Sequence, residues 1–214
     1  MTRLEFLCRI TAPAVELYYK MKYKVHYEGP LPQKGPCLLF AKHQTRDDQF
    51  LIGLFISHAT RRHASYLMRK FVFPLNHVLQ LYGGINVARE REREQGFYGA
   101  EEAKEKNRNA ELEAIRVLKR GEPLVNFPEG TRLYKKMNTK FKLGIVRKIL
   151  NIQKEIAQPY NLPGLPCSIL GIEYEDASKK NSNVWLRAGE PFYVKNTTEL
   201  EQRLLIEIPK LSGL

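Results

Sequence analysis

His43 and Asp48 are the residues of this chain best suited to acid–base chemistry. A neutral imidazole can take a proton from an attacking hydroxyl, while a carboxylate on its other ring nitrogen fixes the tautomer and stabilises the imidazolium that forms. The chain has only three aspartates, and two of them, Asp47 and Asp48, adjoin in one polar run. The pattern predicts a general-base dyad in which a substrate hydroxyl attacks directly, without a Ser or Cys nucleophile.

The spacing restricts how the two side chains of this dyad can meet. On a continuous α-helix His43 and Asp48 would lie about 140° apart, at roughly 100° per residue, so they could not share one face. They can meet only if His43 stays in a loop and Asp48 begins a helix, where the helix dipole favours a carboxylate. A His and an Asp at this spacing also occur by accident, and Asp47 competes with Asp48 for the role.

A second polar segment, Phe127–Arg132, reads FPEGTR and follows a short apolar run. The guanidinium of Arg132 offers a planar set of donors suited to phosphate, and Gly130 lets the backbone approach a ligand closely. Glu129 either positions the loop or contacts substrate hydroxyls. A Pro-Glu-Gly-Thr turn is also common as an ordinary loop, so the predicted phosphate site depends on its neighbours.

The charge of the chain requires an anionic partner. Lys and Arg total 35 against 23 acidic residues, and the formal net charge of +12 suits nucleic acid, a phospholipid surface or a phosphorylated substrate. Between Arg132 and Lys148 there are seven basic residues and no acidic one. Such a run suits lipid head groups or a nucleotide-bearing thioester, although it is also common on a solvated surface. Charge alone does not choose among these partners.

The motifs lie between short apolar runs and segments of helical spacing. Apolar runs bounded by turn signals predict strands at 37–41, 64–68, 83–87, 124–127, 167–173 and 184–188. Helical spacing predicts helices at 49–59, toward Leu81, up to Gly121 after a loop around Gly96 and Gly99, at 144–157 and at 199–208. Strand, polar loop and helix follow one another three times. This order predicts a single α/β domain with a central, mostly parallel sheet flanked by helices, and functional loops at the carboxyl ends of the strands.

The first 24 residues form a segment of their own. Residues 3–22 have apolar side chains at helical spacing and a basic polar side, which is typical of an amphipathic helix at a membrane surface. Taken alone, the pattern favours an ordinary surface helix kinked near Pro13, and only a lipid substrate reverses that preference.

The chain shows no signal for spanning a membrane or for secretion. Arg9, Glu16 and Lys20 interrupt the most apolar N-terminal stretch, so no uncharged run approaches the ~18 to 20 residues of a spanning helix. Arg9 also falls where the apolar region of a signal peptide should lie, and no small-residue cleavage site follows. The three cysteines are far apart in apolar surroundings, which predicts reduced core residues in a cytosolic environment.

Together the motifs resemble those of the glycerolipid acyltransferase family, typified by 1-acyl-sn-glycerol-3-phosphate (lysophosphatidic acid) acyltransferase. The resemblance covers residues 24–195, and several blocks occur in the family's order. In chain order they are His43–Asp48 for the HxxxxD motif, Gly84–Arg89 for the second block, Phe127–Arg132 for FPEGTR in all six positions, Phe141–Gly144 for the Lys and Gly that often follow, and Leu165–Ile169 for the fourth block.

The resemblance implies an O-acyltransferase. A fatty acyl chain would pass from a thioester donor, acyl-CoA or acyl carrier protein, to the free hydroxyl of 1-acyl-sn-glycerol 3-phosphate, giving phosphatidic acid for phospholipid biosynthesis. His43 is then the base and Asp48, preferred to Asp47 on this ground, orients it. The substrate-binding residues implied are Arg89, Glu129, Gly130, Thr131, Arg132 and Lys142. No metal or bound cofactor is needed.

The resemblance also implies a peripheral enzyme on the cytoplasmic face of a membrane. Residues 1–24 would be the membrane-association segment and 25–214 the acyltransferase domain. The partners would be the phospholipid surface, a lysophospholipid acceptor and the acyl donor, without nucleic acid. The chain has Lys42 where many members have Asn, and Thr45 where Ser is frequent. These departures leave the dyad intact and the acceptor open: glycerol 3-phosphate or another lysolipid is the alternative, and a basic lipid- or nucleic-acid-binding module without activity is a further one.

Overall fold

The protein is built around a seven-stranded sheet. The computed structural model describes residues 3–69, 79–80 and 82–214. The strand order is β1-β7-β6-β2-β5-β3-β4, and all neighbours run parallel except β6 and β7. The predicted α/β domain with a central, mostly parallel sheet is therefore confirmed. The strands are β1 Tyr23–Glu28, β2 Cys37–Ala41, β3 Ser65–Arg69, β4 Gly84–Val87, β5 Pro123–Asn126, β6 Cys167–Tyr174 and β7 Ser182–Ala188.

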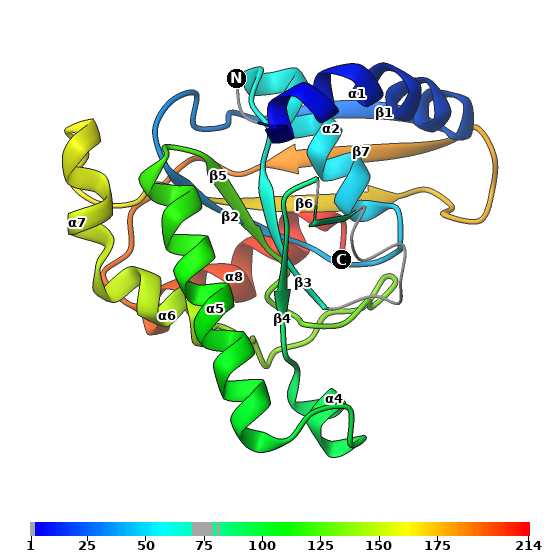
Figure 1. The fold of residues 1–214 in the computed structure, drawn as a ribbon. Coiled ribbons are helices and arrows are strands. Elements are labelled where there is room, and N and C mark those ends of the chain that lie inside the picture. Colours follow the sequence, from blue (N-terminus) through cyan, green and yellow to red (C-terminus); the bar gives the residue numbers. More distant parts are fainter. Residues whose placement is uncertain (1–2, 70–78, 81) are drawn as a thin grey trace.

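Helices cover both faces of the sheet (Figure 1). The helices α1 and α2 lie on one face, and α5, α6 and α8 lie on the other. The helices are α1 Arg3–Lys22, α2 Asp48–Thr60, α4 Glu90–Glu94, α5 Ala100–Lys119, α6 Gly144–Asn151, α7 Gln153–Ala157 and α8 Thr197–Ser212, with a short 3-10 turn at Gln158–Tyr160. In the ranges described, no helix is long and apolar enough to cross a bilayer.

The two faces explain why the central strand reads as an unbroken apolar run. Leu38 and Phe40 of β2 pack in the core formed with α5, α6 and α8. Leu39 and Ala41 pack in the second core, which β2 shares with α1 and α2. Side chains alternate across a strand, so a strand that is covered on both faces must be apolar at every position. The run from Cys37 to Ala41 is completely buried.

The N-terminal helix continues directly into the sheet. α1 ends at Lys22 and β1 begins at Tyr23, pairing in parallel with β7 from Tyr23 opposite Ser182 to Glu28 opposite Arg187. This edge strand is absent from the sequence prediction, because only alternate residues of β1 face the core and Lys24, His26 and Glu28 make the segment polar.

The other predicted helices and strands differ from the observed ones mainly in the residues at which they begin and end. The helix expected at 144–157 is divided at Ile152 into α6 and α7. The one expected to lead toward Leu81 falls largely on residues 70–78 and 81, outside those described.

Cys37 and Cys167 are free and buried, and burial raises the pKa of the Cys37 thiol to about 11. The side chain of Cys8 lies outside the described part.

Candidate active site

His43 and Asp48 meet at the junction between β2 and α2. β2 ends at Ala41, His43 lies in the loop that follows, and Asp48 is the first residue of α2. Nδ1 of His43 lies 2.9 Å from Oδ2 of Asp48. The imidazole is 17% exposed, while the carboxylate is completely buried. With Nδ1 occupied by the carboxylate, Nε2 is the ring nitrogen left for a substrate proton.

The Asp48 carboxylate is held by donors from three other residues. Its Oδ2 accepts hydrogen bonds from the backbone N–H of Thr45 at 2.8 Å and from that of Gln44. Its Oδ1 accepts from the Thr45 hydroxyl at 2.9 Å and the Tyr174 hydroxyl at 2.6 Å. Burial, together with the Asp48 charge, raises the pKa of Tyr174, so its hydroxyl remains a donor. These donors stabilise Asp48 as an anion facing His43.

The neighbouring carboxylate, Asp47, faces α1 and β1 instead. Its Oδ2 accepts from Nζ of Lys22 at 2.6 Å and from the Tyr23 hydroxyl at 2.8 Å. Its Oδ1 accepts from the Tyr19 hydroxyl at 3.2 Å. Burial and the contact with Asp47 raise the pKa of Tyr23 to about 12. Of the two aspartates that compete in the sequence, Asp48 is thus the one in contact with His43.

The FPEGTR turn lies beside this loop because β2 and β5 are parallel neighbours. The carboxyl ends of adjacent parallel strands share one edge of the sheet. The ring of Phe127 lies 4.5 Å from that of His43, at an interplanar angle of 36°. The backbone N–H of Leu133 donates to the His43 carbonyl at 2.9 Å. The second predicted motif is therefore in direct contact with the first.

Within the turn, Gly130 and Lys142 pack closely. Gly130 has φ +66°, and a Cβ there would approach Cγ of Lys142 to 3.0 Å. The backbone N–H of Lys142 donates to the Pro128 carbonyl at 2.7 Å. The Lys142 side chain is exposed, and its Nζ lies 3.6 Å from the Glu90 carboxylate. Thr131 is also exposed.

Glu129 points into the protein. Its two carboxylate oxygens lie 2.7 and 2.8 Å from Nζ of Lys42, and Oε2 also accepts from the backbone N–H of Asn138 at 3.0 Å. The carboxylate is completely buried. Of the two roles that the sequence leaves open for Glu129, this geometry favours positioning the loop over contact with a substrate. One feature of the sequence could have pointed to the role of Lys42: it stands where many members of the family have Asn.

Three arginines gather at the carboxyl ends of neighbouring strands. Arg69 is the last residue of β3, Arg89 follows the end of β4 by two positions, and Arg132 follows β5. Burial lowers the pKa of Arg89, and the charges of Arg69 and Arg132 lower it further, against the opposite effect of Glu92. Arg132 and Arg89 are sequence predictions, whereas Arg69 is an addition from the structure. Guanidinium groups whose charges act on one another are suited to an anion with more than one charge.

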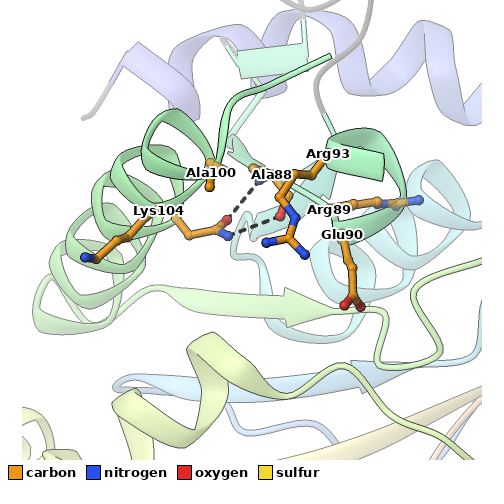
Figure 2. A pocket seen from close by; sticks show the side chains of 8 residues that line it. Ala88, Arg89, Glu90, Arg93, Ala100 and Lys104 are labelled. Atoms are coloured by element: carbon orange, nitrogen blue, oxygen red, sulfur yellow. Dashed lines mark hydrogen bonds between the residues drawn. The ribbon is translucent and has the colours of Figure 1, made fainter. Parts of the chain in front are cut away.

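A cavity of about 300 Å³ lies behind Arg89, between α4 and the start of α5 (Figure 2). The Asn107 side chain accepts from the backbone N–H of Ala88 at 2.9 Å and donates to the Ala88 carbonyl at 3.2 Å. These bonds, dashed in Figure 2, fix the backbone next to Arg89. In Figure 2 the side chains of Arg89 and Lys104 extend away from one another. Of the three clustered arginines, Arg89 lines the cavity and Arg69 and Arg132 do not. The residues described include no group of His, Cys, Asp or Glu that could hold a metal ion.

Comparison with known proteins gives two findings. A family model described as Acyltransferase matches residues 22–170. A crystal structure of the 1-acyl-sn-glycerophosphate (LPA) acyltransferase PlsC from Thermotoga maritima superposes with a TM-score of 0.55 at 17% sequence identity, covering 97% of this chain and 77% of that chain. At this identity the likeness is one of fold. No curated protein matches the chain.

Proposed function

Because the chain belongs to the acyltransferase family, we propose that it transfers a fatty acyl chain from a thioester donor to the free hydroxyl of 1-acyl-sn-glycerol 3-phosphate, giving phosphatidic acid. The observation that carries this proposal is the His43–Asp48 contact at the same sheet edge as Arg69, Arg89 and Arg132. A base for the hydroxyl and cations for a phosphate are the two requirements of this acceptor. The solved structure of similar fold is an LPA acyltransferase, which supports the choice.

The dyad accounts for the chemical step. Asp48 holds Nδ1–H of His43, so Nε2 takes the proton of the acceptor hydroxyl as its oxygen bonds to the thioester carbonyl carbon. Collapse of the tetrahedral intermediate breaks the carbon–sulfur bond. The thiolate leaves with the proton that His43 carries, which returns the imidazole to its neutral form.

The arginine cluster accounts for the acceptor. A phosphate monoester carries up to two negative charges, and the charges of Arg69 and Arg132 act on the half-buried Arg89. Binding the phosphate relieves the repulsion among the guanidinium groups and places the glycerol hydroxyl toward the loop that carries His43. Exposed Thr131 and Lys142 border the same turn and contribute further contacts to the head group.

The outer face of α1 accounts for access to a lipid. Ile10, Leu17, Tyr18 and Met21 are exposed on this helix, and Phe50 of α2 is exposed beside it, with its ring 6.0 Å from that of Tyr19. Exposed apolar side chains together with basic ones favour the interface of an anionic bilayer. Through Asp47 the same helix is tied to the catalytic loop. We place the enzyme on the cytoplasmic face of a membrane as a peripheral protein.

The test is thiol release from palmitoyl-CoA on vesicles that contain lysophosphatidic acid. Wild type is compared with His43→Ala and with His58→Ala, an exposed histidine on α2 that serves as the matched control. We expect acceptor-dependent release with wild type and His58→Ala, and none with His43→Ala. Turnover by a well-folded His43→Ala variant would contradict the base assignment.

Two further assays identify which donor and which acceptor the enzyme uses. Acyl carrier protein replaces coenzyme A in one, and glycerol 3-phosphate or lysophosphatidylcholine replaces lysophosphatidic acid in the other. Preference for lysophosphatidic acid supports the proposed acceptor, and equal use of all three contradicts it. No release from either donor with any acceptor contradicts acyl transfer altogether.

A further inference from the structure

Lys42 and Glu129 form an ion pair beneath the proposed active site. Both side chains are completely buried, and Nζ of Lys42 lies 2.7 and 2.8 Å from the two oxygens of Glu129. A third bond runs from the same Nζ to the Lys136 carbonyl at 2.6 Å. The three protons of an ammonium group match these three acceptors. Lys42 therefore has no proton left for a substrate and cannot act as a phosphate ligand.

The pair joins the three chain segments that carry the proposed site. Lys42 is the residue before His43, and Glu129 lies three positions before Arg132. Lys136 and Asn138, which bind Nζ and the carboxylate, belong to the segment that leads to Lys142. The backbone N–H of His43 also points to Oε1 of Glu129, at 3.5 Å. The ion pair is thus a direct mechanical connection between the base and the residues proposed to hold the phosphate.

Burial of both charges carries a cost in free energy of folding. Two charges are removed from water, and the loss of either partner leaves the other uncompensated in the interior. Apolar side chains of similar size would hold the loops together at least as well in terms of stability. What an ammonium–carboxylate pair adds is direction, because its hydrogen bonds restrict the angle and distance between the segments that carry its two partners.

We propose that Lys42 is a positioning residue of the acyl transfer reaction, which acts through Glu129 to fix the place of the phosphate-binding turn relative to His43. The inference rests on the proposed function and adds a residue to it. The acceptor is held at its phosphate by Arg132 and loses a proton at its hydroxyl to His43. A displacement of one loop against the other separates the hydroxyl from the base without removing any group that binds the lipid.

The decisive variant removes both charges. Lys42→Met alone leaves the buried Glu129 carboxylate without a cation, and we expect a large loss of stability. In Lys42→Met/Glu129→Gln no unpaired charge remains, so the protein is expected to fold. A displacement near 1 Å is enough to cost roughly 100-fold in rate. We therefore expect kcat to fall about 100-fold, with KM for lysophosphatidic acid within about threefold of wild type.

Arg62 supplies a matched control at the opposite edge of the sheet. Its guanidinium donates to the carbonyls of Pro32 at 3.1 Å, Gly35 at 2.5 Å and Gly121. Gly35 precedes β2 and Gly121 precedes β5, so Arg62 joins the same two strands where they begin. Arg62→Met is expected to lower the melting temperature and leave kcat per folded molecule unchanged.

The experiment compares kcat, KM and melting temperature for wild type, the double variant and Arg62→Met. A double variant with kcat near that of wild type overturns the proposal, and so does an equal loss of kcat in Arg62→Met. If wild type transfers no acyl group, the proposed function fails, and the positioning role is read from the His43 ring resonances, assigned by their loss in His43→Ala. A shift of these resonances in the double variant but not in Arg62→Met supports the connection. Unchanged resonances overturn it.

Discussion

The hydroxyl of Tyr174 lies 2.6 Å from Oδ1 of Asp48, the same carboxylate whose Oδ2 contacts His43. Tyr174 ends β6, whereas Asp48 begins α2, and the contact places a buried phenol behind the dyad. One oxygen of the carboxylate thus contacts the imidazole of His43 and the other accepts from the phenol of Tyr174. The position of the carboxylate against His43 depends on both contacts.

The first prediction concerns this phenol. In Tyr174→Phe the Asp48 carboxylate loses one hydrogen-bond donor and is held less firmly against His43. We expect kcat to fall roughly tenfold, the equivalent of one hydrogen bond of about 1 to 1.5 kcal/mol. The measurement is kcat of wild type and Tyr174→Phe at the same pH. A kcat equal to that of wild type contradicts the prediction.

The second prediction separates the two adjacent aspartates. Asp48→Asn removes the charge that orients His43, and we expect kcat to fall by about 10³ to 10⁴ with the fold retained. Asp47→Asn weakens the bonds to Tyr19, Lys22 and Tyr23. We expect it to lower the free energy of unfolding by about 1 kcal/mol and to keep kcat within about threefold of wild type. Equal effects of the two substitutions on kcat would exclude the assignment of Asp48.

The third prediction concerns the phosphate. Arg132→Ala is expected to raise KM for lysophosphatidic acid by about 30- to 100-fold, the equivalent of one charge-assisted hydrogen bond of about 2 to 3 kcal/mol. Arg147→Ala removes an exposed positive charge from the same basic run and is the matched control. Initial rates against acceptor concentration give both values. An equal rise of KM in the two variants indicates a general effect of charge and argues against a phosphate site at Arg132.

The fourth prediction concerns the face of α1. Leu17→Glu/Met21→Glu places two charges on the exposed apolar side of this helix. We expect retention on anionic vesicles to fall at least tenfold, since each side chain contributes on the order of 1 to 2 kcal/mol by burial in the interface. Leu205→Glu, on an exposed position of α8, is the control. Vesicle flotation measures the bound fraction, and equal retention of all three proteins contradicts the membrane role of α1.

The fifth prediction concerns alkaline pH. Burial raises the pKa of Cys37 to about 11, against an ordinary value of 9.0, so the unfolded chain loses this proton first. The contribution of the thiol to stability is complete below about pH 9 and is lost as the pH rises to about 11. We expect a loss on the order of 2 to 3 kcal/mol in the free energy of unfolding over this range, and a smaller loss in Cys37→Ala. Urea denaturation at pH 8 and pH 10.5 tests the difference.

The sequence alone predicts those strands and helices whose pattern of apolar and polar residues is complete within the element itself. The run from Cys37 to Ala41 is apolar at every position, and its bounds as β2 agree with the structure because a strand covered on both faces leaves no polar position. β1 was missed because it is an edge strand. The signal that could have found it is the alternation of Tyr23, Val25 and Tyr27, whose side chains turn inward.

The partners of the site residues depend on contacts that no local pattern contains. Tyr174 is 126 positions from Asp48 and Lys42 is 87 positions from Glu129, so both contacts exist only after the sheet has formed. Which of Asp47 and Asp48 faces His43 was open for the same reason. Their spacing permits either, and the choice is made by α1, whose tyrosine and lysine occupy Asp47. The catalytic and binding roles of these residues stay predictions until the variants are measured.

The strand order also has a consequence for how the chain folds during synthesis. β1 pairs with β7 in the described sheet, although 159 positions separate Val25 from its partner Val184. The ribosome makes α1 and β1 before β7, yet the place of β1 in the sheet exists only when residues 182–188 have emerged. Such distant pairing is slow to form. Under the membrane role proposed for α1, its apolar side chains would be available to a bilayer before β7 is made, so the nascent chain would bind the membrane before the sheet is complete.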